Sequence, residues 1–206
     1  MADPETTTRT AAKPRPRWLI GGLVACLVLL LAAGGALMLV DRGADRQGGG
    51  IGGPFALMDG DGHEVTDRSF RGKWMLVYFG YTHCPDACPT ALNTMANALD
   101  VKGLHKENVA LVFITVDPER DTPAVVKDYV GAFDAPITAL SGSRAAVDQA
   151  MREYRVYAAR HDTKDGYDMD HSSIIYVMDP KGAFVANFTH ETSPEQIAAK
   201  LKALGA

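Results

Sequence analysis

The feature that most constrains the fold is an apolar run that ends in a pair of cysteines. The run from Met75 to Tyr81 predicts a buried strand. Cys84 and Cys88 follow it, and Pro89 suits the first turn of a helix because a helix start leaves its N–H groups unpaired. The cysteines are therefore expected where a strand delivers the chain to a helix N-terminus. The free N–H groups and the helix dipole favour the thiolate there, the form that attacks disulfides and binds metals.

The chain beyond residue 53 alternates between apolar runs and amphipathic segments. Apolar patterns predict strands at 55–58, 63–65, 109–116, 137–140, 173–178 and 183–188. Helical periodicity and N-terminal capping residues predict helices at 90–99, 122–133, 143–154 and 193–204. Continuous apolar strands separated by helices indicate an α/β fold, a mixed central sheet flanked by helices, and a late hairpin adds antiparallel strands. Together with the cysteine turn, this order is thioredoxin-like.

An uncharged segment near the N-terminus predicts a membrane anchor. Residues 18–40 carry no charge, and a helix of that length spans roughly 34 Å, enough for a hydrocarbon core of about 30 Å. A cleaved signal peptide fits less well, because its apolar core usually has about 7–15 residues. We expect a cytoplasmic tail at 1–17, one transmembrane helix at 18–40, a flexible linker at 41–53 and a folded domain at 54–206. The Lys and Arg residues before the anchor predict that this domain faces outward.

The charge balance argues against nucleic-acid binding. Residues 53–206 carry 15 Lys and Arg against 21 Asp and Glu, a net charge of −6, and they contain no basic stripe. An acidic surface suits a basic protein partner or a cation, and much of this charge simply keeps the domain soluble.

The spacing of Cys84 and Cys88 leaves three uses open. A structural disulfide would close a loop of about five residues and stabilise the fold by only about 2 kcal/mol, which makes it the weakest explanation. A dithiol–disulfide couple is feasible, because one helical turn separates the residues by about 6 Å, inside the range of a disulfide. Two thiolates that converge on one soft cation are equally feasible, and thiolates select Cu(I) or Zn.

His171 is the best candidate for a third ligand. It precedes a run that we expect to form a strand beside the cysteine-bearing one, and loops at the ends of neighbouring strands converge. Two sulfurs and one nitrogen would then face a single ion, a donor set that suits copper. Asp170 is expected to orient the imidazole as a hydrogen-bond acceptor. The thioether of Met169 is a candidate soft ligand, but a Met in a loop is more often apolar filler, which is the favoured interpretation.

Two neighbouring features are assigned supporting roles. His83 is adjacent to Cys84, and because neighbouring side chains diverge, we expect it to position or tune the site rather than ligate. The segment Asp117–Asp121 is expected to end a core strand and cap the next helix, and a partner contact is the less favoured interpretation. No partner pattern accompanies the remaining histidines, His63, His105, His161 and His190.

At these residues the chain resembles the Sco/SenC family. The matching motifs spread over nearly all of 53–206: Gly72-Lys73-Trp74, Tyr78 to Pro89, Val116 to Pro123 and Asp170 to Val177. The resemblance implies a thioredoxin-like domain that binds one copper ion through Cys84, Cys88 and His171. It also implies a role in maturing the dinuclear copper (CuA) site of cytochrome c oxidase, with subunit II as the partner.

Two functions compete under this resemblance. One is a copper chaperone, a binding and transfer protein, and the other is a membrane-tethered thiol–disulfide oxidoreductase that reduces target cysteines. Thioredoxin-type reductants typically use a Cys-x-x-Cys pair and a facing cis-proline. Here the spacing is one residue longer, and no proline lies between Pro136 and Pro180. We therefore favour the chaperone and leave open whether the protein is also an enzyme with thiol–disulfide reductase activity.

The topology predicts a single-pass protein of a bacterial inner membrane with its C-terminal domain in the periplasm. The alternative is a mitochondrial inner membrane with the domain in the intermembrane space. The acidic start at Asp3 and Glu5 does not resemble an Arg- and Ser-rich transit segment. In an oxidising compartment, target cysteines must be reduced before they take copper, so periplasmic copper carriers and thiol reductants are further candidate partners.

Overall fold

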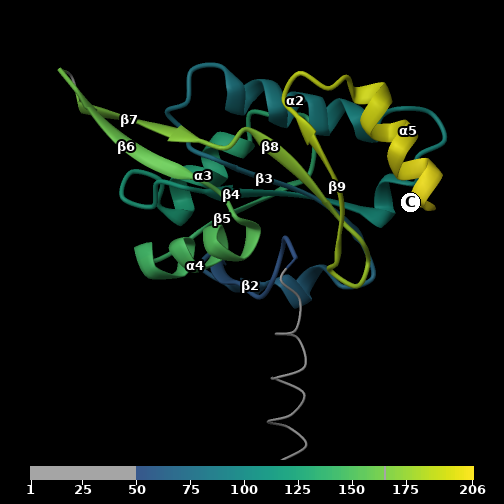
Figure 1. The fold of residues 1–206 in the computed structure, drawn as a ribbon, viewed down its shortest axis with the longest axis horizontal. Helices are drawn as coiled ribbons and strands as arrows, with labels where there is room; N and C mark the ends of the chain where they lie inside the picture. Colours follow the sequence, from purple (N-terminus) through teal and green to yellow (C-terminus); the bar gives the residue numbers. More distant parts are fainter. Residues whose placement is uncertain (1–49, 165) are drawn as a thin grey trace, which may run out of the picture. The chain divides into compact units, whose positions relative to one another are not determined.

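A seven-stranded mixed sheet organises the part of the chain that this computed structural model describes, residues 50–164 and 166–206 (Figure 1). Its strand order is β2-β1-β5-β4-β3-β8-β9. The strands are β1 Ala56–Asp59, β2 Glu64–Thr66, β3 Trp74–Gly80, β4 Val109–Thr115, β5 Ile137–Ser141, β8 Ile174–Met178 and β9 Phe184–Thr189. The helices are α2 Ala87–Leu99, α3 Pro123–Val130, α4 Arg144–Tyr154 and α5 Pro194–Leu204, with short 3-10 turns at Asp67–Phe70 and Lys106–Asn108.

The central strands have the directions of a thioredoxin-like sheet. β3, β4 and β5 run parallel, whereas β8 pairs antiparallel with β3 and places Ile175 opposite Tyr78. β9 then pairs antiparallel with β8, and β1 pairs antiparallel with β5. This arrangement confirms the predicted α/β class and the late antiparallel hairpin.

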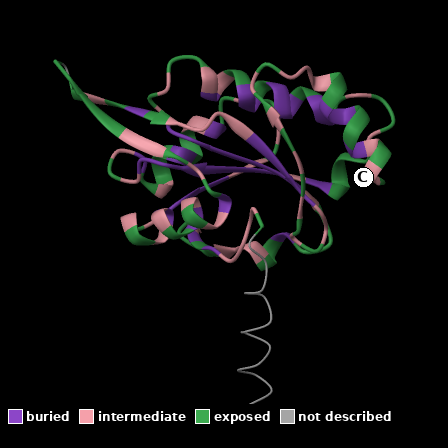
Figure 2. Ribbon diagram, viewed as in Figure 1, coloured by how far each residue is buried: buried purple, intermediate pink, exposed green. Residues whose placement is uncertain are grey.

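Helices cover both faces of the sheet, which explains why its central strands are apolar throughout. Figure 1 shows α2 and α5 along one side of the strands and α4 on the other side. Buried positions follow β3, β4 and β8 and the inner side of α2 (Figure 2). The predicted helix starts are confirmed where Thr122, Ser143 and Ser193 accept hydrogen bonds as N-cap residues of α3, α4 and α5.

A second, two-stranded sheet was not predicted from the sequence. β6 (Ala158–Thr163) and β7 (Gly166–His171) pair only with each other and form a hairpin that projects from the main sheet (Figure 1). The alternation of Tyr167, Met169 and His171 is a period-2 signal, but most of the hairpin is exposed and carries few of the apolar residues that mark a strand.

The predicted cytoplasmic tail at 1–17 and transmembrane helix at 18–40 lie outside the described residues. Residues 50–53 of the predicted linker are described: Ile51 packs against the core, and the N–H of Gly52 donates to the carbonyl of Glu153 at 2.8 Å. No helix within the described ranges is long and apolar enough to cross a bilayer.

Candidate metal centre

Cys84, Cys88 and His171 come together at the C-terminal end of β3. Cys84 lies in the turn after β3, and Cys88 lies in the first turn of α2. Because β8 runs antiparallel to β3, the residues just before β8, including His171, lie beside the end of β3. The three ligating atoms lie within 4.8 Å of one another, and the Sγ atom of Cys88 is 3.4 Å from the Nε2 atom of His171. The fold thus joins residues that are 83 positions apart.

The two cysteines are free thiols with different environments. Cys84 is partly exposed, and its sulfur accepts a hydrogen bond from the backbone N–H of Cys88 at 3.4 Å. A hydrogen bond from the Cys88 thiol, with further ones from His171 and from the backbone at Cys88 and Asp86, holds the pKa of Cys84 well below its usual range. Donation to Cys84 and burial raise the pKa of Cys88. In the metal-free pair these contacts favour the thiolate at the partly exposed Cys84 over the buried Cys88.

Two tyrosines hold the imidazole of His171 edge-on. The ring centroid of Tyr78 lies 6.0 Å away at 83°, and that of Tyr81 lies 5.7 Å away at 89°. The Nδ1 atom of His171 is 3.3 Å from the carbonyl oxygen of Ser172. To bind a metal through Nε2, the imidazole must give up any proton that it donates to the cysteines, and Nδ1 can then carry the proton and donate to this carbonyl.

The predicted role of Asp170 is wrong. Its carboxylate pairs with the Nε2 atom of His161 at 2.6 Å on the exposed surface of the hairpin. The physical reason is the strand geometry, because successive side chains in a strand point to opposite faces. Asp170 therefore points away from the side on which His171 meets the cysteines, and the carbonyl of Ser172 faces Nδ1 instead.

Gly80 and Tyr78 shape the space around the buried sulfur. A Cβ atom at Gly80 would lie 2.7 Å from the Sγ atom of Cys88 and 3.1 Å from the ring of Phe113, so only glycine lets the sulfur approach β3 this closely. The hydroxyl of Tyr78 lies 3.9 Å from the same sulfur. Gly80 was not singled out from the sequence, although a glycine at the end of an apolar strand often marks such a close approach.

His83 lies outside the group of ligand atoms, and Met169 lies in the core. His83 is exposed, its Nδ1 atom is 3.1 Å from the hydroxyl of Thr82, and it does not belong to the group of converging ligand atoms. Met169 is 9% exposed and packs in the core, as expected of apolar filler.

The segment Asp117–Asp121 does more than was predicted. It follows the end of β4, as expected, but Thr122 caps α3 and Asp121 does not. Asp121 is completely buried and accepts hydrogen bonds from the N–H of Thr82 at 3.0 Å, the hydroxyl of Thr82 at 2.6 Å and the hydroxyl of Thr115 at 2.7 Å. These donors satisfy a buried carboxylate and link the segment to the cysteine-bearing turn.

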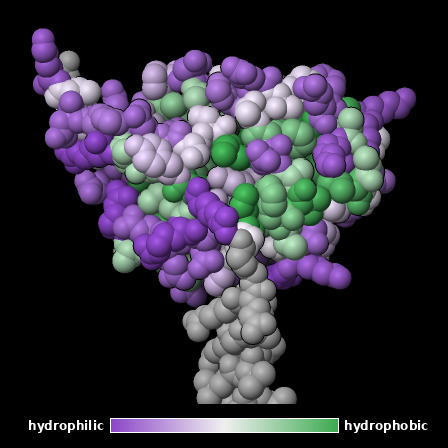
Figure 3. All heavy atoms as spheres, in the orientation of Figure 1, coloured by the Kyte–Doolittle hydropathy of each residue, from purple (hydrophilic) through white to green (hydrophobic). Residues whose placement is uncertain are grey.

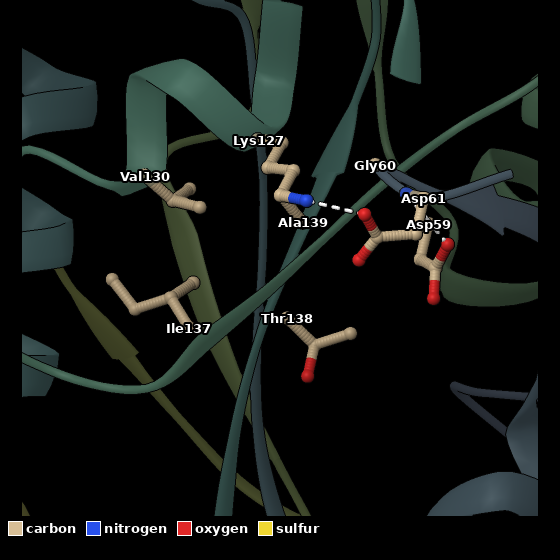
Figure 4. Close-up of a pocket in the computed structure, with 8 residues that line it drawn as sticks. All are labelled: Asp59, Gly60, Asp61, Lys127, Val130, Ile137, Thr138 and Ala139. Atoms are coloured by element: carbon tan, nitrogen blue, oxygen red, sulfur yellow. Dashed lines mark hydrogen bonds and ion pairs between the residues drawn. The ribbon is translucent and has the colours of Figure 1, made fainter. Parts of the chain in front are cut away.

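A groove of about 210 Å³ lies away from this centre, beside the turn between β1 and β2 (Figure 4). An ion pair between Lys127 and Asp61 crosses its rim, and Ile137, Thr138 and Ala139 of β5 form part of its wall. None of the three converging ligand residues lines it, so the groove and the cysteine centre are separate features.

The sequence of this chain is similar to those of known proteins. A sequence model described as SCO1/SenC matches residues 43–206. The protein SCO1 homolog 1, mitochondrial, of Arabidopsis thaliana is 43% identical over 148 residues, which cover 71% of this chain and 44% of the relative. The SCO2-like protein of Rickettsia felis is 37% identical over 155 residues, which cover 74% of this chain and 76% of the relative. This chain thus spans less than half of the Arabidopsis protein's length.

A solved structure is matched over nearly its whole length. The structure of Bradyrhizobium japonicum ScoI with copper bound superposes with a TM-score of 0.69 at 49% sequence identity. The match covers 74% of this chain and 98% of that chain. The thioredoxin-like domain described above is therefore the part that the two proteins share.

Proposed function

Because the chain belongs to the SCO1/SenC family, we propose that it is a copper chaperone for the assembly of cytochrome c oxidase. The observation that carries this proposal is the convergence of two cysteine sulfurs and one imidazole nitrogen within 4.8 Å. Support also comes from the related ScoI of Bradyrhizobium japonicum, whose solved structure contains copper.

Cys84, Cys88 and His171 are the proposed ligands of one copper ion per chain. Two thiolates and one imidazole form a soft donor set, which suits Cu(I) better than hard cations. Binding would displace the proton that Cys88 holds in the metal-free protein, so copper affinity should rise with pH. Cys84 is the more exposed sulfur, and we assign it the first exchange with a partner's thiolate, while buried Cys88 keeps its hold on the ion.

The proposed acceptor is the CuA site of cytochrome c oxidase subunit II. The second candidate function is reduction of that site's cysteines, and the thiolate character of Cys84 favours it. In that reaction the Cys84 thiolate attacks a target disulfide, and one target sulfur leaves as a thiolate and takes the proton of Cys88. The Cys88 sulfur then attacks Cys84 in the mixed disulfide, and the second target sulfur leaves as a thiolate that takes a proton from water. The target gains a dithiol, this chain ends as the Cys84–Cys88 disulfide, and His171 forms no bond in the exchange, although its hydrogen bond favours the Cys84 thiolate.

A transfer experiment separates the two functions. Copper-loaded protein is mixed with the reduced copper site of subunit II, and copper is expected to move in a one-to-one encounter with no thiol oxidised. Copper on each protein is measured after separation, and free thiols are counted in the same samples. The His171→Ala variant is the matched control, because it keeps the dithiol and removes the proposed third ligand. Copper that stays with the donor, while the metal-free dithiol quickly reduces an oxidised target, would make the reductase the main function.

We extend the proposal to the organisation of the whole chain. It comprises a cytoplasmic tail at 1–17, a transmembrane helix at 18–40, a flexible linker at 41–53 and the copper-binding domain at 54–206. The domain would lie in the periplasm of a bacterial inner membrane, where copper carriers and thiol reductants are further partners. The uncharged stretch at 18–40 and the basic residues before it support this topology.

Reporter fusions test the orientation. Alkaline phosphatase fused after Ala206 is expected to be active, because it needs the disulfides that form outside the cytoplasm. The same reporter fused after Arg17, before the anchor, is the control and should be inactive. If alkaline phosphatase after Ala206 is inactive and a reporter that needs the cytoplasm is active there, both the topology and the proposed partner are contradicted.

A further inference from the structure

His171 lies on a hairpin that the main sheet does not incorporate. β6 and β7 pair only with each other, and four of the six residues of β6 and half of those of β7 are exposed. Figure 3 shows that the projecting end of this hairpin is hydrophilic. The pairing of β8 with β3 places His171 near the end of β3, and Met169 packs in the core. The main sheet makes no strand pairing with β6 or β7, so other contacts are needed to fix the orientation of the hairpin.

Several contacts between the hairpin and the segment Asp117–Asp121 involve Tyr167, four residues before His171. Its hydroxyl donates to Asp117 at 2.9 Å, and its carbonyl oxygen accepts from the guanidinium of Arg120 at 2.8 Å. The guanidinium carbons of Arg120 and Arg160 each lie 3.7 Å from the centroid of its ring. Residues four apart in a strand share a face, so Tyr167 and His171 lie on the same side of β7.

Arg120 and Tyr81 connect Tyr167 to the imidazole of His171. The guanidinium carbon of Arg120 also lies 5.7 Å from the ring centroid of Tyr81, and Tyr81 packs edge-on against His171. Asp117, which is 1% exposed, accepts a hydrogen bond from the Nε atom of Arg120 and keeps its guanidinium in place. Cation–π contacts of this kind are attractive because the charge of the guanidinium faces the electron-rich side of the ring.

The other end of the same segment holds the cysteine-bearing turn. Asp121 accepts hydrogen bonds from both the N–H and the hydroxyl of Thr82, two residues before Cys84. The carbonyl of Asp121 also accepts from the hydroxyl of Ser141 in β5, which ties the segment to the main sheet. One run of five residues therefore contacts both ligand-bearing elements.

We propose that Asp117–Asp121 is a brace that sets the distance between His171 and the two cysteines, with Tyr167 as the point where it grips the hairpin. Tyr167 is a positioning residue, because its contacts are with the brace and with Arg160 and not with the ligand atoms. The inference deepens the proposed copper site and rests on it, because it names what presents the third ligand.

Copper(I) titration of the full chain tests the brace. Tyr167→Leu removes the ring and the hydroxyl together and is expected to weaken copper binding about 10–100-fold, the usual effect of losing a group that orients a ligand. Tyr167→Phe keeps the stacked ring and should lose less. Tyr157→Leu is the matched control at the base of the same hairpin, because Tyr157 is 62% exposed, and its affinity should equal that of the parent.

A double variant shows whether Tyr167 acts through His171. If it does, Tyr167→Leu combined with His171→Ala binds copper no more weakly than His171→Ala alone. If the copper affinity of the double variant falls by the product of the two single losses, Tyr167 acts independently of His171, and the proposal is overturned.

The metal-free protein supplies a readout that does not depend on copper. The nuclear Overhauser effect between the rings of His171 and Tyr81 should be present in the parent and in Tyr157→Leu, and lost in Tyr167→Leu, while the amide signals of β3 and β4 stay unchanged. An unchanged ring contact in Tyr167→Leu would refute the brace. If the parent chain fails to bind copper, the proposed function is refuted. The brace is then still tested by the contact between the rings of His171 and Tyr81, because that contact is measured without metal.

Discussion

Replacing Cys88 by serine is expected to abolish tight copper binding, lowering the metal content of protein dialysed against a copper chelator from one ion per chain to none. The Sγ atom of Cys88 is 3.4 Å from Nε2 of His171, so it joins the other two ligands. A serine hydroxyl is a hard donor that stays protonated, whereas Cu(I) prefers thiolate. Metal analysis and competition with a chelator of known affinity measure the loss.

The matched variant is Cys84→Ser, which should lose copper to the same extent. Its side chain is partly exposed, so it changes stability little, whereas a serine at the completely buried position 88 risks an unpaired hydroxyl at a cost of about 1–3 kcal/mol. Circular dichroism and thermal unfolding of both variants separate lost ligation from lost folding. Either variant binding one copper with parental affinity would remove the cysteine pair from the site.

Replacing His171 by alanine is expected to weaken copper binding strongly and to leave the Cys84–Cys88 disulfide able to form. The imidazole contributes one of three converging donors. Cys84 lies in the turn before α2 and Cys88 in the first turn of α2, so their sulfurs lie close together without help from the histidine. Copper affinity is measured by chelator competition, and disulfide formation by thiol counting after mild oxidation. Copper affinity equal to that of the parent would make His171 incidental and would favour the reductase.

The same variant has a predictable effect on the reactivity of Cys84. Because a hydrogen bond from His171 helps to lower the pKa of Cys84, its removal should raise that pKa. The thiolate would then persist over a narrower range on the acid side, and the midpoint of Cys84 alkylation would move to higher pH. The hydrogen bond from Cys88 remains and still favours the thiolate.

The parts of this protein that can be predicted from its sequence are those that depend on interactions between neighbouring residues. The apolar run of β3 and the capping residues of α3, α4 and α5 act over a few neighbouring residues, so their patterns predict the elements directly. Cys84 and Cys88 are prominent for the same reason, because a strand and a helix start flank them within one short segment. The prediction that the bound ion is copper rests on the donor chemistry of the proposed ligands and on the family resemblance, because the spacing of the cysteines alone does not select a metal.

The tertiary structure decided how these parts meet. The sequence by itself predicted the cysteine turn and the α/β order of elements, because short-range patterns carry that information. It offered His171 as the candidate third ligand from its place before a strand, with the support of the family resemblance. It did not reveal that Asp121 holds Thr82 or that Asp117 holds Tyr167, contacts that span 39 and 50 positions. It also favoured Asp170 as the partner of His171, although the strand places the two side chains on opposite faces. Such contacts follow from the packing of distant segments, and no local pattern encodes which buried carboxylate will find which donor.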